Sequence, residues 1–280
     1  MEPRSTLSPT PTRPTQAASD SPIGVFDSGV GGLTVLREIR RELPAEHLLY
    51  VADSAHAPYG DMPPDRIEAR SVAITAFLIG QGAKAIVIAC NTATGAAAAA
   101  LRTRFDLPIV AMEPAVKPAV GLTRSGVVGV LATSQTLASD KFETLRGRFD
   151  GHARVLVQPC PGLVERIEAG DPDGDSARAL IADYVLPLIA QGADTLVLGC
   201  THYPLARAQI QDIAGPGVTI TDAGAAVARQ LRMRLEQCHR LSTRDESGSE
   251  RFWRSGHPDM ASAMIGTIWG QPAGVRHLRL

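Results

Sequence analysis

Two cysteines stand at the ends of two similar apolar stretches. Residues 81–92 read QGAKAIVIACNT and residues 191–202 read QGADTLVLGCTH, so Cys90 and Cys200 follow the same Gln-Gly-Ala start at the same offset. A thiol can act as an acid, and its thiolate as a base, when the surroundings tune the cysteine pKa. One thiol on each face of a carbon atom could therefore remove a proton on one side and deliver one on the other. Inversion of a stereocentre needs this chemistry.

Polar side chains that could assist the thiols follow other apolar runs. Asp27 ends the run IGVFD before a glycine-rich GVGGL, and it could polarise the thiol of Cys90 on an adjacent strand. His202 could do the same for Cys200, although a packing or surface histidine is the alternative. Short polar side chains suited to binding carboxylates complete this set: Ser28, Asn91, Thr92, Thr133, Thr136 and Thr201.

Several other kinds of site do not fit the sequence. The turn at residues 29–32 reads GVGG, which is not GxGxxG, and no GxxxxGK[ST] occurs, so the motifs do not favour nucleotide binding. The four cysteines form no CxxC pair, which argues against a zinc knuckle or a thioredoxin-like centre. We expect no metal and no cofactor, and we interpret the remaining thiols, Cys160 and Cys238, as structural.

Short apolar runs alternate with helical patterns along most of the chain. The expected strands are residues 23–27, 47–53, 83–90, 107–112, 126–133, 153–158, 193–200 and 217–220. Such alternation predicts parallel sheets covered by helices on both faces. The runs IGVFDS and VGVLAT, at residues 23–28 and 128–133, repeat at nearly the same interval as the two cysteine runs. We therefore predict two pseudo-symmetric α/β domains with parallel sheets.

Ligands of open parallel sheets bind at the carboxyl ends of the strands. Two such domains placed face to face would therefore present Cys90 and Cys200 from opposite sides of one interdomain cleft. The expected organisation is a disordered tail at 1–21, a first domain at 22–113 plus 223–280, and a second domain at 114–222. A third domain is not expected, because the apolar spacing after residue 250 suits packing against the first half.

Composition narrows the classes of partner. The net charge of the 280 residues is −1 at 44% hydrophobic content, which gives no electrostatic reason to expect nucleic acid or a membrane surface. The apolar runs are also too short to span a bilayer. Residues 1–21 contain no apolar segment of a secretory signal, so we expect a cytoplasmic protein with free thiols.

Four motifs, DSGVGGL, PYG, ACNTAT and GCTHYPL, occur in this order and together resemble those of the glutamate racemases, in the aspartate/glutamate racemase superfamily. The resemblance runs from about residue 22 to the C-terminus. It implies cofactor-independent interconversion of L- and D-glutamate by two bases in a buried cleft between two α/β domains, with D-glutamate feeding peptidoglycan synthesis. It leaves open a homodimer and activation by a cell-wall precursor.

The resemblance also assigns roles to individual residues. It makes Cys90 the thiol that takes the proton from D-glutamate and Cys200 the thiol that takes it from L-glutamate. The segment CPGLVERIEAG at 160–170 resembles the one that carries an assisting glutamate, which would be Glu168, and an exposed helix glutamate is the alternative. Asp27 and His202 would assist the thiols as well as contact substrate. The further substrate contacts implied are Ser28, Tyr59, Gly60, Asn91, Thr92, Thr133, Thr136 and Thr201.

Two other functions stay open at this level. An aspartate or hydantoin racemase would share the fold and the thiol pair, but the GCTHYPL motif and the long C-terminal return favour glutamate. A catalytically inactive amino-acid sensor on the same scaffold would belong to another class. Loss of one thiol would mark such a sensor, and both thiols are present.

Overall fold

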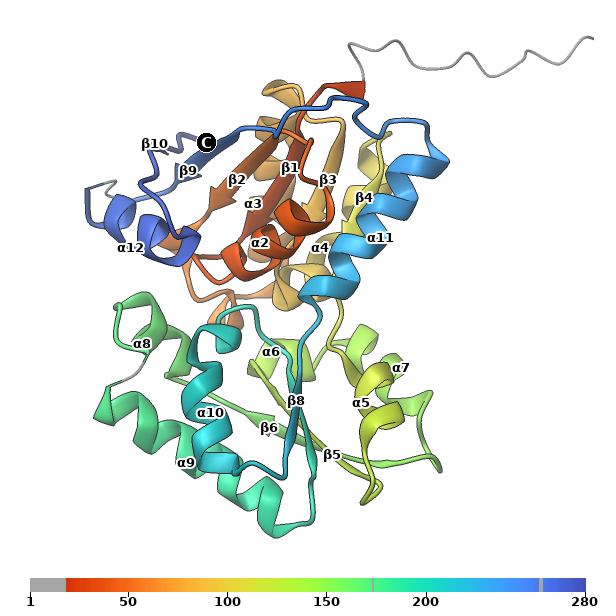
Figure 1. The fold of residues 1–280 in the computed structure, drawn as a ribbon, viewed down its shortest axis with the longest axis vertical. Coiled ribbons are helices and arrows are strands. Elements are labelled where there is room, and N and C mark those ends of the chain that lie inside the picture. Colours follow the sequence, from red (N-terminus) through yellow and green to blue (C-terminus); the bar gives the residue numbers. More distant parts are fainter. Residues whose placement is uncertain (1–18, 173, 257–258) are drawn as a thin grey trace, which may run out of the picture.

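The computed structural model of the chain describes residues 19–172, 174–256 and 259–280. The predicted disordered tail, residues 1–21, lies almost wholly outside these ranges. In the described part, the strands form two sheets, and every pairing between neighbouring strands is parallel. Figure 1 shows one sheet above the other along the long axis of the molecule, each with helices packed around it. The predicted α/β class with two parallel sheets is confirmed.

The first sheet combines strands from both ends of the described chain. In spatial order it consists of β10 (Val275–His277), β9 (Glu250–Arg254), β2 (Leu48–Ala52), β1 (Ile23–Asp27), β3 (Ala85–Ile88) and β4 (Ile109–Ala111). The sequence predicted the last four of these but neither β9 nor β10. Because β9 pairs with β2, the C-terminal segment returns to the first sheet.

The second sheet repeats the order of the first. It consists of β6 (Arg154–Pro159), β5 (Val127–Ala132), β7 (Thr195–Leu198) and β8 (Thr219–Thr221). The first strand of each series lies between the second and the third, and the fourth follows the third. The cysteine strands β3 and β7 therefore occupy equivalent places, as their repeated sequences predict.

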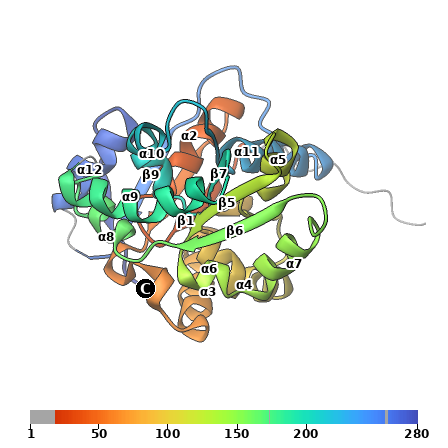
Figure 2. The ribbon, with the colours of Figure 1, turned by 90° about the horizontal axis from the view of Figure 1, so that it is seen from below.

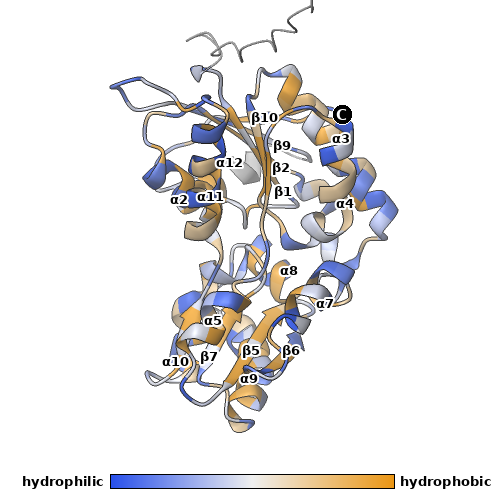
Figure 3. Ribbon diagram, turned by 90° about the vertical axis from the view of Figure 1, so that its right-hand side faces the viewer, coloured by the Kyte–Doolittle hydropathy of each residue, from blue (hydrophilic) through white to orange (hydrophobic). Residues whose placement is uncertain are grey.

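Helices bury both faces of the first sheet. One face is covered by α2 (Leu33–Glu42), α11 (Gly224–Gln237) and α12 (Asp259–Trp269), and the other by α3 (Pro64–Gly80) and α4 (Asn91–Arg104) (Figure 3). Successive side chains of a strand point to opposite faces. Accordingly, Val25 of β1 belongs to the apolar cluster with α2 and α11, whereas Phe26 belongs to the cluster with α3 and α4. Burial on both faces explains why these strands read as continuous apolar runs.

The second sheet is enclosed in the same way. On one face lie α8 (Leu163–Glu168), α9 (Asp175–Ala190) and α10 (Arg207–Ala214), and on the other α5 (Val116–Leu122) and α7 (Asp140–Gly147). Figure 2 shows α8, α9 and α10 to one side of β5 and β6, with α7 on the opposite side. After β8, the chain crosses back to α11, which packs against α2.

Short helices occupy the carboxyl ends of the strands. Following β2 are η1 (Ser54–His56) and η2 (Tyr59–Asp61), following β5 is α6 (Ser134–Leu137), and following β7 is η3 (Tyr203–Ala206). These turns bring η2 of the first sheet against α6 of the second. Among the helices of the described ranges, none combines the length and the apolar character that a bilayer crossing requires.

Candidate active site

The carboxyl ends of both sheets converge on one small hollow. Its lining residues are Ser28, Pro58, Tyr59, Gly60, Cys90, Asn91, Thr92, Thr133, Val164, Cys200, Thr201 and His202. The accessible volume is about 10 Å³, which is roughly the space that one water molecule needs. A ligand larger than water can therefore enter only if the ends of the two sheets move apart.

Cys200 belongs to a chain of ionisable groups. Its Sγ atom lies 3.7 Å from Nδ1 of His202, and Nε2 of His202 lies 2.7 Å from Oε1 of Glu168 on α8. His202 is 1% exposed at its side chain and Glu168 is 14% exposed, so neither the surface-histidine nor the exposed-glutamate alternative is correct. Burial alone would lower the pKa of His202, but the contacts with Cys200 and Glu168 raise it well above its usual value.

The carboxylate of Glu168 is prepared to hold a charged histidine. Burial raises the pKa of Glu168, but the hydrogen bond and charge of His202 and the amide of Val30 outweigh burial, so the pKa falls below its usual value. An ionised Glu168 beside an imidazolium is thus the favoured state of the pair. In that state, Nδ1 of His202 can hold the proton of the Cys200 thiol, leaving a thiolate.

The glycine-rich loop after β1 reaches across to this pair. The amide of Val30 donates to Oε1 of Glu168 at 2.7 Å, and the amide of Gly31 lies 3.3 Å from Nε2 of His202. A Cβ atom at Gly29 would overlap Oε1 of Glu168, and one at Gly31 would lie 2.5 Å from Nδ1 of His202. Glycine is therefore needed here for the close approach of backbone to side chains, rather than to bind phosphate.

Cys90 has a different set of partners. It precedes α4, and its Sγ atom accepts from the amide of Ala93 at 3.4 Å. The thiol lies 3.8 Å from Oγ of Ser28, and this hydroxyl lies 3.3 Å from Oδ1 of Asp27. Among the hydrogen bonds of the described residues, Asp27 makes none with Cys90 directly. The predicted assistance of Cys90 by Asp27 would therefore pass through the hydroxyl of Ser28.

Burial governs the charges around Cys90. Burial, followed by the neighbouring Asp27 carboxylate, raises the pKa of Cys90, so this thiol keeps its proton at neutral pH. Burial also raises the pKa of Asp27, although the charge of His202 and the amides of Gly32 and Ser28 oppose that rise. A carboxyl group with a raised pKa is suited to exchange a proton with a thiol of raised pKa.

Polar contacts join the two sheets around both thiols. Oγ1 of Thr201 donates to Oδ2 of Asp27 at 3.2 Å. Thr201, which follows Cys200, therefore holds the carboxylate that lies behind Cys90. Oγ1 of Thr92 lies 3.0 Å from that of Thr133 and 3.2 Å from that of Thr136. The site therefore depends on the approach of the two sheets, because each half completes the hydrogen bonds of the other.

The Tyr59–Gly60 segment is held by a buried carboxylate. The hydroxyl of Tyr59 donates to Oδ2 of Asp53 at 2.7 Å, and Arg70 donates to both oxygens of Asp53 at 2.9 and 2.7 Å. A Cβ atom at Gly60 would lie 3.0 Å from Cβ of Thr133, so this segment closes against the second sheet. Both polar atoms of the buried Asn91 side chain lack a hydrogen-bond partner within the described ranges, and they are suited to a polar ligand.

All the sequence-predicted site residues gather here, although Asp27, Thr136 and Glu168 lie behind the lining residues. The predictions omitted two lining residues, Pro58 and Val164, and two supporting residues, Tyr50 and Arg70. Pro58 lies in the PYG motif, whereas nothing in the sequence distinguishes the other three from ordinary strand and helix residues. Within the described ranges, no cluster of three or more His, Cys, Asp or Glu side chains has an arrangement that could hold a metal ion.

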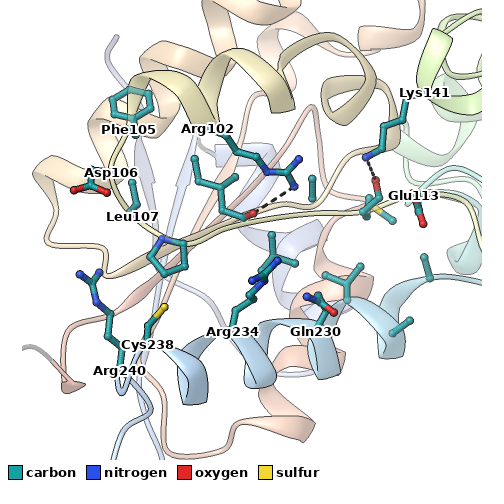
Figure 4. A pocket seen from close by; sticks show the side chains of 18 residues that line it. Arg102, Phe105, Asp106, Leu107, Glu113, Lys141, Gln230, Arg234, Cys238 and Arg240 are labelled. Carbon is teal, nitrogen blue, oxygen red and sulfur yellow. Dashed lines mark hydrogen bonds between the residues drawn. The ribbon is translucent and has the colours of Figure 1, made fainter. Parts of the chain in front are cut away.

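A larger hollow of about 1080 Å³ lies along β4, between α4 and α11 (Figure 4). It contains none of the predicted site residues. Four cations line it, namely Arg102, Lys141, Arg234 and Arg240. Two of them donate to backbone carbonyls, Arg102 to that of Ile109 and Lys141 to that of Met112, and so cover the open edge of the first sheet.

Comparison with known proteins places this chain in a family. Residues 23–231 match the sequence model of the Asp/Glu/hydantoin racemase family. The chain therefore belongs to this family of racemases. The glutamate racemase of Stutzerimonas stutzeri (strain A1501) is 54% identical over 256 residues, covering 91% of this chain and 96% of that protein.

Two solved structures have the same fold along most of the chain. Escherichia coli glutamate racemase in complex with L-glutamate is 32% identical with a TM-score of 0.81, covering 92% of this chain and 97% of that one. Glutamate racemase from Francisella tularensis in complex with D-glutamate is 28% identical with a TM-score of 0.80, covering 93% and 98%. Within its family, the chain groups with the glutamate racemases and is an amino-acid racemase, which confirms the resemblance found in the four motifs.

Proposed function

We propose that this chain interconverts L- and D-glutamate by proton exchange between Cα and two thiols, those of Cys90 and Cys200. One observation carries the proposal: the thiols end equivalent strands of two sheets, line the same closed hollow, and each has its own proton partners. The choice of glutamate is supported by relatives that carry this name and by solved relatives that hold its L and D forms.

In the proposed reaction, one thiolate takes the Cα proton, and the electron pair of that bond stays on the substrate as a carbanion. The opposite thiol donates its proton to the other face, which completes inversion and leaves that sulfur as the new thiolate. We assign Cys200 to L-glutamate and Cys90 to D-glutamate. His202, backed by Glu168, takes the Cys200 proton before an L-to-D turnover, and Ser28 with Asp27 serves Cys90 before the reverse.

Uncharged polar side chains and a helix N-terminus are proposed to bind the substrate. Among the residues that line the hollow, none is a lysine or an arginine. The hydroxyls of Thr92, Thr133 and Thr201, Nδ2 of Asn91 and the N-terminus of α4 are therefore proposed to donate to the carboxylates. Oδ1 of Asn91 and hydroxyl oxygens are proposed to accept from the ammonium group. We further propose that residues 22–113 with 223–280, and residues 114–222, are domains that separate to admit glutamate.

The wider role is also a proposal. D-glutamate made by this chain would feed peptidoglycan synthesis in the cytoplasm. Support for a reducing compartment comes from the four cysteines, all of which are free and two of which must stay reduced for the proposed chemistry.

Circular dichroism of glutamate solutions tests the proposal. The purified chain, without added cofactor, should bring the signals of L- and D-glutamate to zero, and in D₂O the Cα position should take up deuterium. L-aspartate is the matched control, and its signal should persist. A persistent glutamate signal with decay of the aspartate signal would make the chain an aspartate racemase. Activity lost to a chelator and restored by a metal would contradict the two-thiol mechanism.

A further inference from the structure

We infer that Tyr50 is a positioning residue for the Cys200 half of the reaction and acts through the backbone of residues 29–31. This inference rests on the proposed two-thiol mechanism and adds to it a residue that touches neither thiol. Tyr50 lies in the middle of β2 and is completely buried. Its hydroxyl donates to the carbonyl oxygen of Gly29 at 2.7 Å.

The ring of Tyr50 is fixed from behind. It packs edge-to-face against Phe252 of β9, with ring centroids 6.3 Å apart. At the other end, a Cβ atom at Gly32 would lie 2.9 Å from the Tyr50 hydroxyl, so this oxygen lies directly beneath the glycine-rich loop. A rigid ring with its hydroxyl under the loop can set the height of the loop above the sheet.

The loop has two kinds of attachment. Both of its ends are tied to Asp27, because the amides of Ser28 and Gly32 donate to the Asp27 carboxylate at 2.7 and 2.6 Å. Its middle is held by Tyr50 through the Gly29 carbonyl. The carbonyls of Val30 and Gly31 accept from the amides of Leu33 and Thr34. Removal of the Tyr50 hydroxyl would therefore free the Gly29 carbonyl, beside the Val30 amide that donates to Glu168, and leave both ends of the loop in place.

The middle of the loop contacts the partners of Cys200. The Val30 amide donates to Oε1 of Glu168, and the Gly31 amide faces Nε2 of His202. Nε2 cannot accept from Gly31 and donate to Glu168 at once, and its 2.7 Å contact with Glu168 requires a shared proton. With Nε2 donating to Glu168, Nδ1 is the nitrogen left to exchange a proton with the thiol of Cys200, 3.7 Å away. A displaced loop would release Glu168 and disturb this arrangement.

Removal of the Tyr50 hydroxyl should therefore slow proton transfer at Cys200 and leave proton transfer at Cys90 unchanged. Cys90 and its contacts with Ser28 and Asp27 depend on the ends of the loop, which stay attached. Racemisation itself cannot reveal the difference, because L- and D-glutamate are equal in free energy and kcat/KM must therefore remain the same in both directions for any variant. An irreversible reaction that begins at one thiol can reveal it.

Elimination from glutamate analogues with a leaving group on Cβ provides such a reaction. The base takes the Cα proton, the electron pair of that bond forms the Cα–Cβ double bond, and the leaving group departs with its own bonding pair. The product hydrolyses to a 2-oxo acid and ammonia, and the 2-oxo acid is measured separately for the L and D analogues. Cys200→Ser identifies the analogue that depends on Cys200, whichever enantiomer that is.

Tyr50→Phe keeps the ring and removes only the hydroxyl. We expect kcat for the Cys200-dependent analogue to fall about tenfold, the effect of one buried hydrogen bond, and kcat for the other analogue to fall less than about twofold. Tyr184→Phe is the matched control, since it removes a hydroxyl that also donates to a backbone carbonyl at 2.7 Å, that of Pro161. Its two rates should both stay near those of the parent protein.

Gly29→Ala tests the contact between the loop and Glu168 if Tyr50→Phe folds poorly. The added methyl group would push on Glu168 from the loop side, so the loss should again be concentrated on the Cys200-dependent analogue. Equal losses on both analogues, or no loss from Tyr50→Phe, would overturn the role of Tyr50 while leaving the two-thiol mechanism intact. If the parent protein eliminated from neither analogue and racemised no glutamate, the proposed function itself would be overturned, and this inference with it.

Discussion

Cys90 and Cys200 follow equivalent strands, yet their surroundings differ in kind. Cys200 faces an imidazole that is backed by a carboxylate, so two ionisable groups stand in line behind the sulfur. Cys90 faces the hydroxyl of Ser28, and the carboxylate of Asp27 lies behind that hydroxyl. Duplication of the fold thus explains why two thiols meet, but it does not explain how each of them loses or regains a proton.

The comparison also shows that neither half is complete alone. In the second domain, Glu168 accepts from the Val30 amide of the glycine-rich loop of the first, and the Gly31 amide of that loop lies 3.3 Å from Nε2 of His202. Conversely, the carboxylate of Asp27 in the first sheet receives the hydroxyl of Thr201 from the second. Because residues of the opposite domain hold the proton partners of each thiol, we expect these partners to reach their positions only when the cleft closes.

Removal of either thiol should have the largest effect. Cys90→Ala and Cys200→Ala should each lower racemisation at least about a hundredfold, because each removes the acid or base on one face of Cα. Circular dichroism of L- and D-glutamate measures the loss. The two-thiol hypothesis would be wrong if either variant kept more than about a tenth of the parent turnover, a barrier change of only about 1.4 kcal/mol.

Serine substitutions at the same two positions distinguish the two halves of the reaction, because each one removes a single thiol. Cys90→Ser should still begin elimination from the L-configured β-substituted analogue through Cys200, and Cys200→Ser should show the mirror preference. A swapped preference would keep the mechanism and reverse the assignment of faces. Equal losses on both analogues in both variants would mean that the thiols act jointly.

The sequence predicted the strands that carry the thiols better than it predicted the margins of the sheets. β3 and β7 are buried on both faces, so their sequences AIVI and TLVL stand out as apolar runs. β9 and β10, with sequences ERFWR and VRH, carry charged side chains at the outer part of the first sheet and gave no such signal. β10 is an edge strand, and β9 is buried only at Phe252 and Trp253, so both can keep charged side chains in contact with water.

The proton partners of the thiols also differ in how well the sequence predicted them. His202 could be predicted because it lies two residues from Cys200, whereas Glu168 was located only by its resemblance to a family segment. The contact between Val30 and Glu168 joins residues 138 positions apart, and local patterns carry no information on such a pair. Tyr50 reads as an ordinary buried strand residue, and only the folded loop shows what its hydroxyl holds.

Neutralising Glu168 should change the pH dependence of elimination from the Cys200-dependent analogue only. Burial lowers the pKa of His202, while Cys200 and Glu168 raise it, so loss of the Glu168 charge should lower it again. In Glu168→Gln, the imidazolium would lose its proton at lower pH. His202 would then take the thiol proton of Cys200 less readily, so the rise with pH of elimination from the Cys200-dependent analogue should move to higher pH by about one unit, and the rate at neutral pH should fall about tenfold.

Glu165→Gln is the matched control for that measurement. Glu165 lies on the same helix, one turn earlier, but its side chain is exposed. Its pH profile should coincide with that of the parent protein. An unmoved acid limb in Glu168→Gln would show that the carboxylate does not govern the His202 proton, and a shift of equal size for both analogues would remove the distinction between the two halves.

The smallest effect is expected at a third thiol that also follows a strand end. Cys160 comes directly after β6, the counterpart of β2, but it is buried outside the lining of the hollow. Burial raises its pKa to about 12, and its Sγ atom donates to the carbonyl of Gln158 at 3.4 Å. This thiol should therefore keep its proton and contribute packing, as the sequence-based interpretation of a structural cysteine holds.

Cys160→Ala should cost about 1 kcal/mol of unfolding free energy, because it removes one buried sulfur atom and leaves a small cavity. Urea unfolding measures that loss. The ratio of elimination rates from the L and D analogues should stay unchanged, because neither set of proton partners includes Cys160. Cys238→Ala, at an exposed position, should change neither quantity. A changed ratio in Cys160→Ala alone would add this sulfur to the Cys200 half and would mean that a strand-end position, even outside the hollow, is enough to join the chemistry.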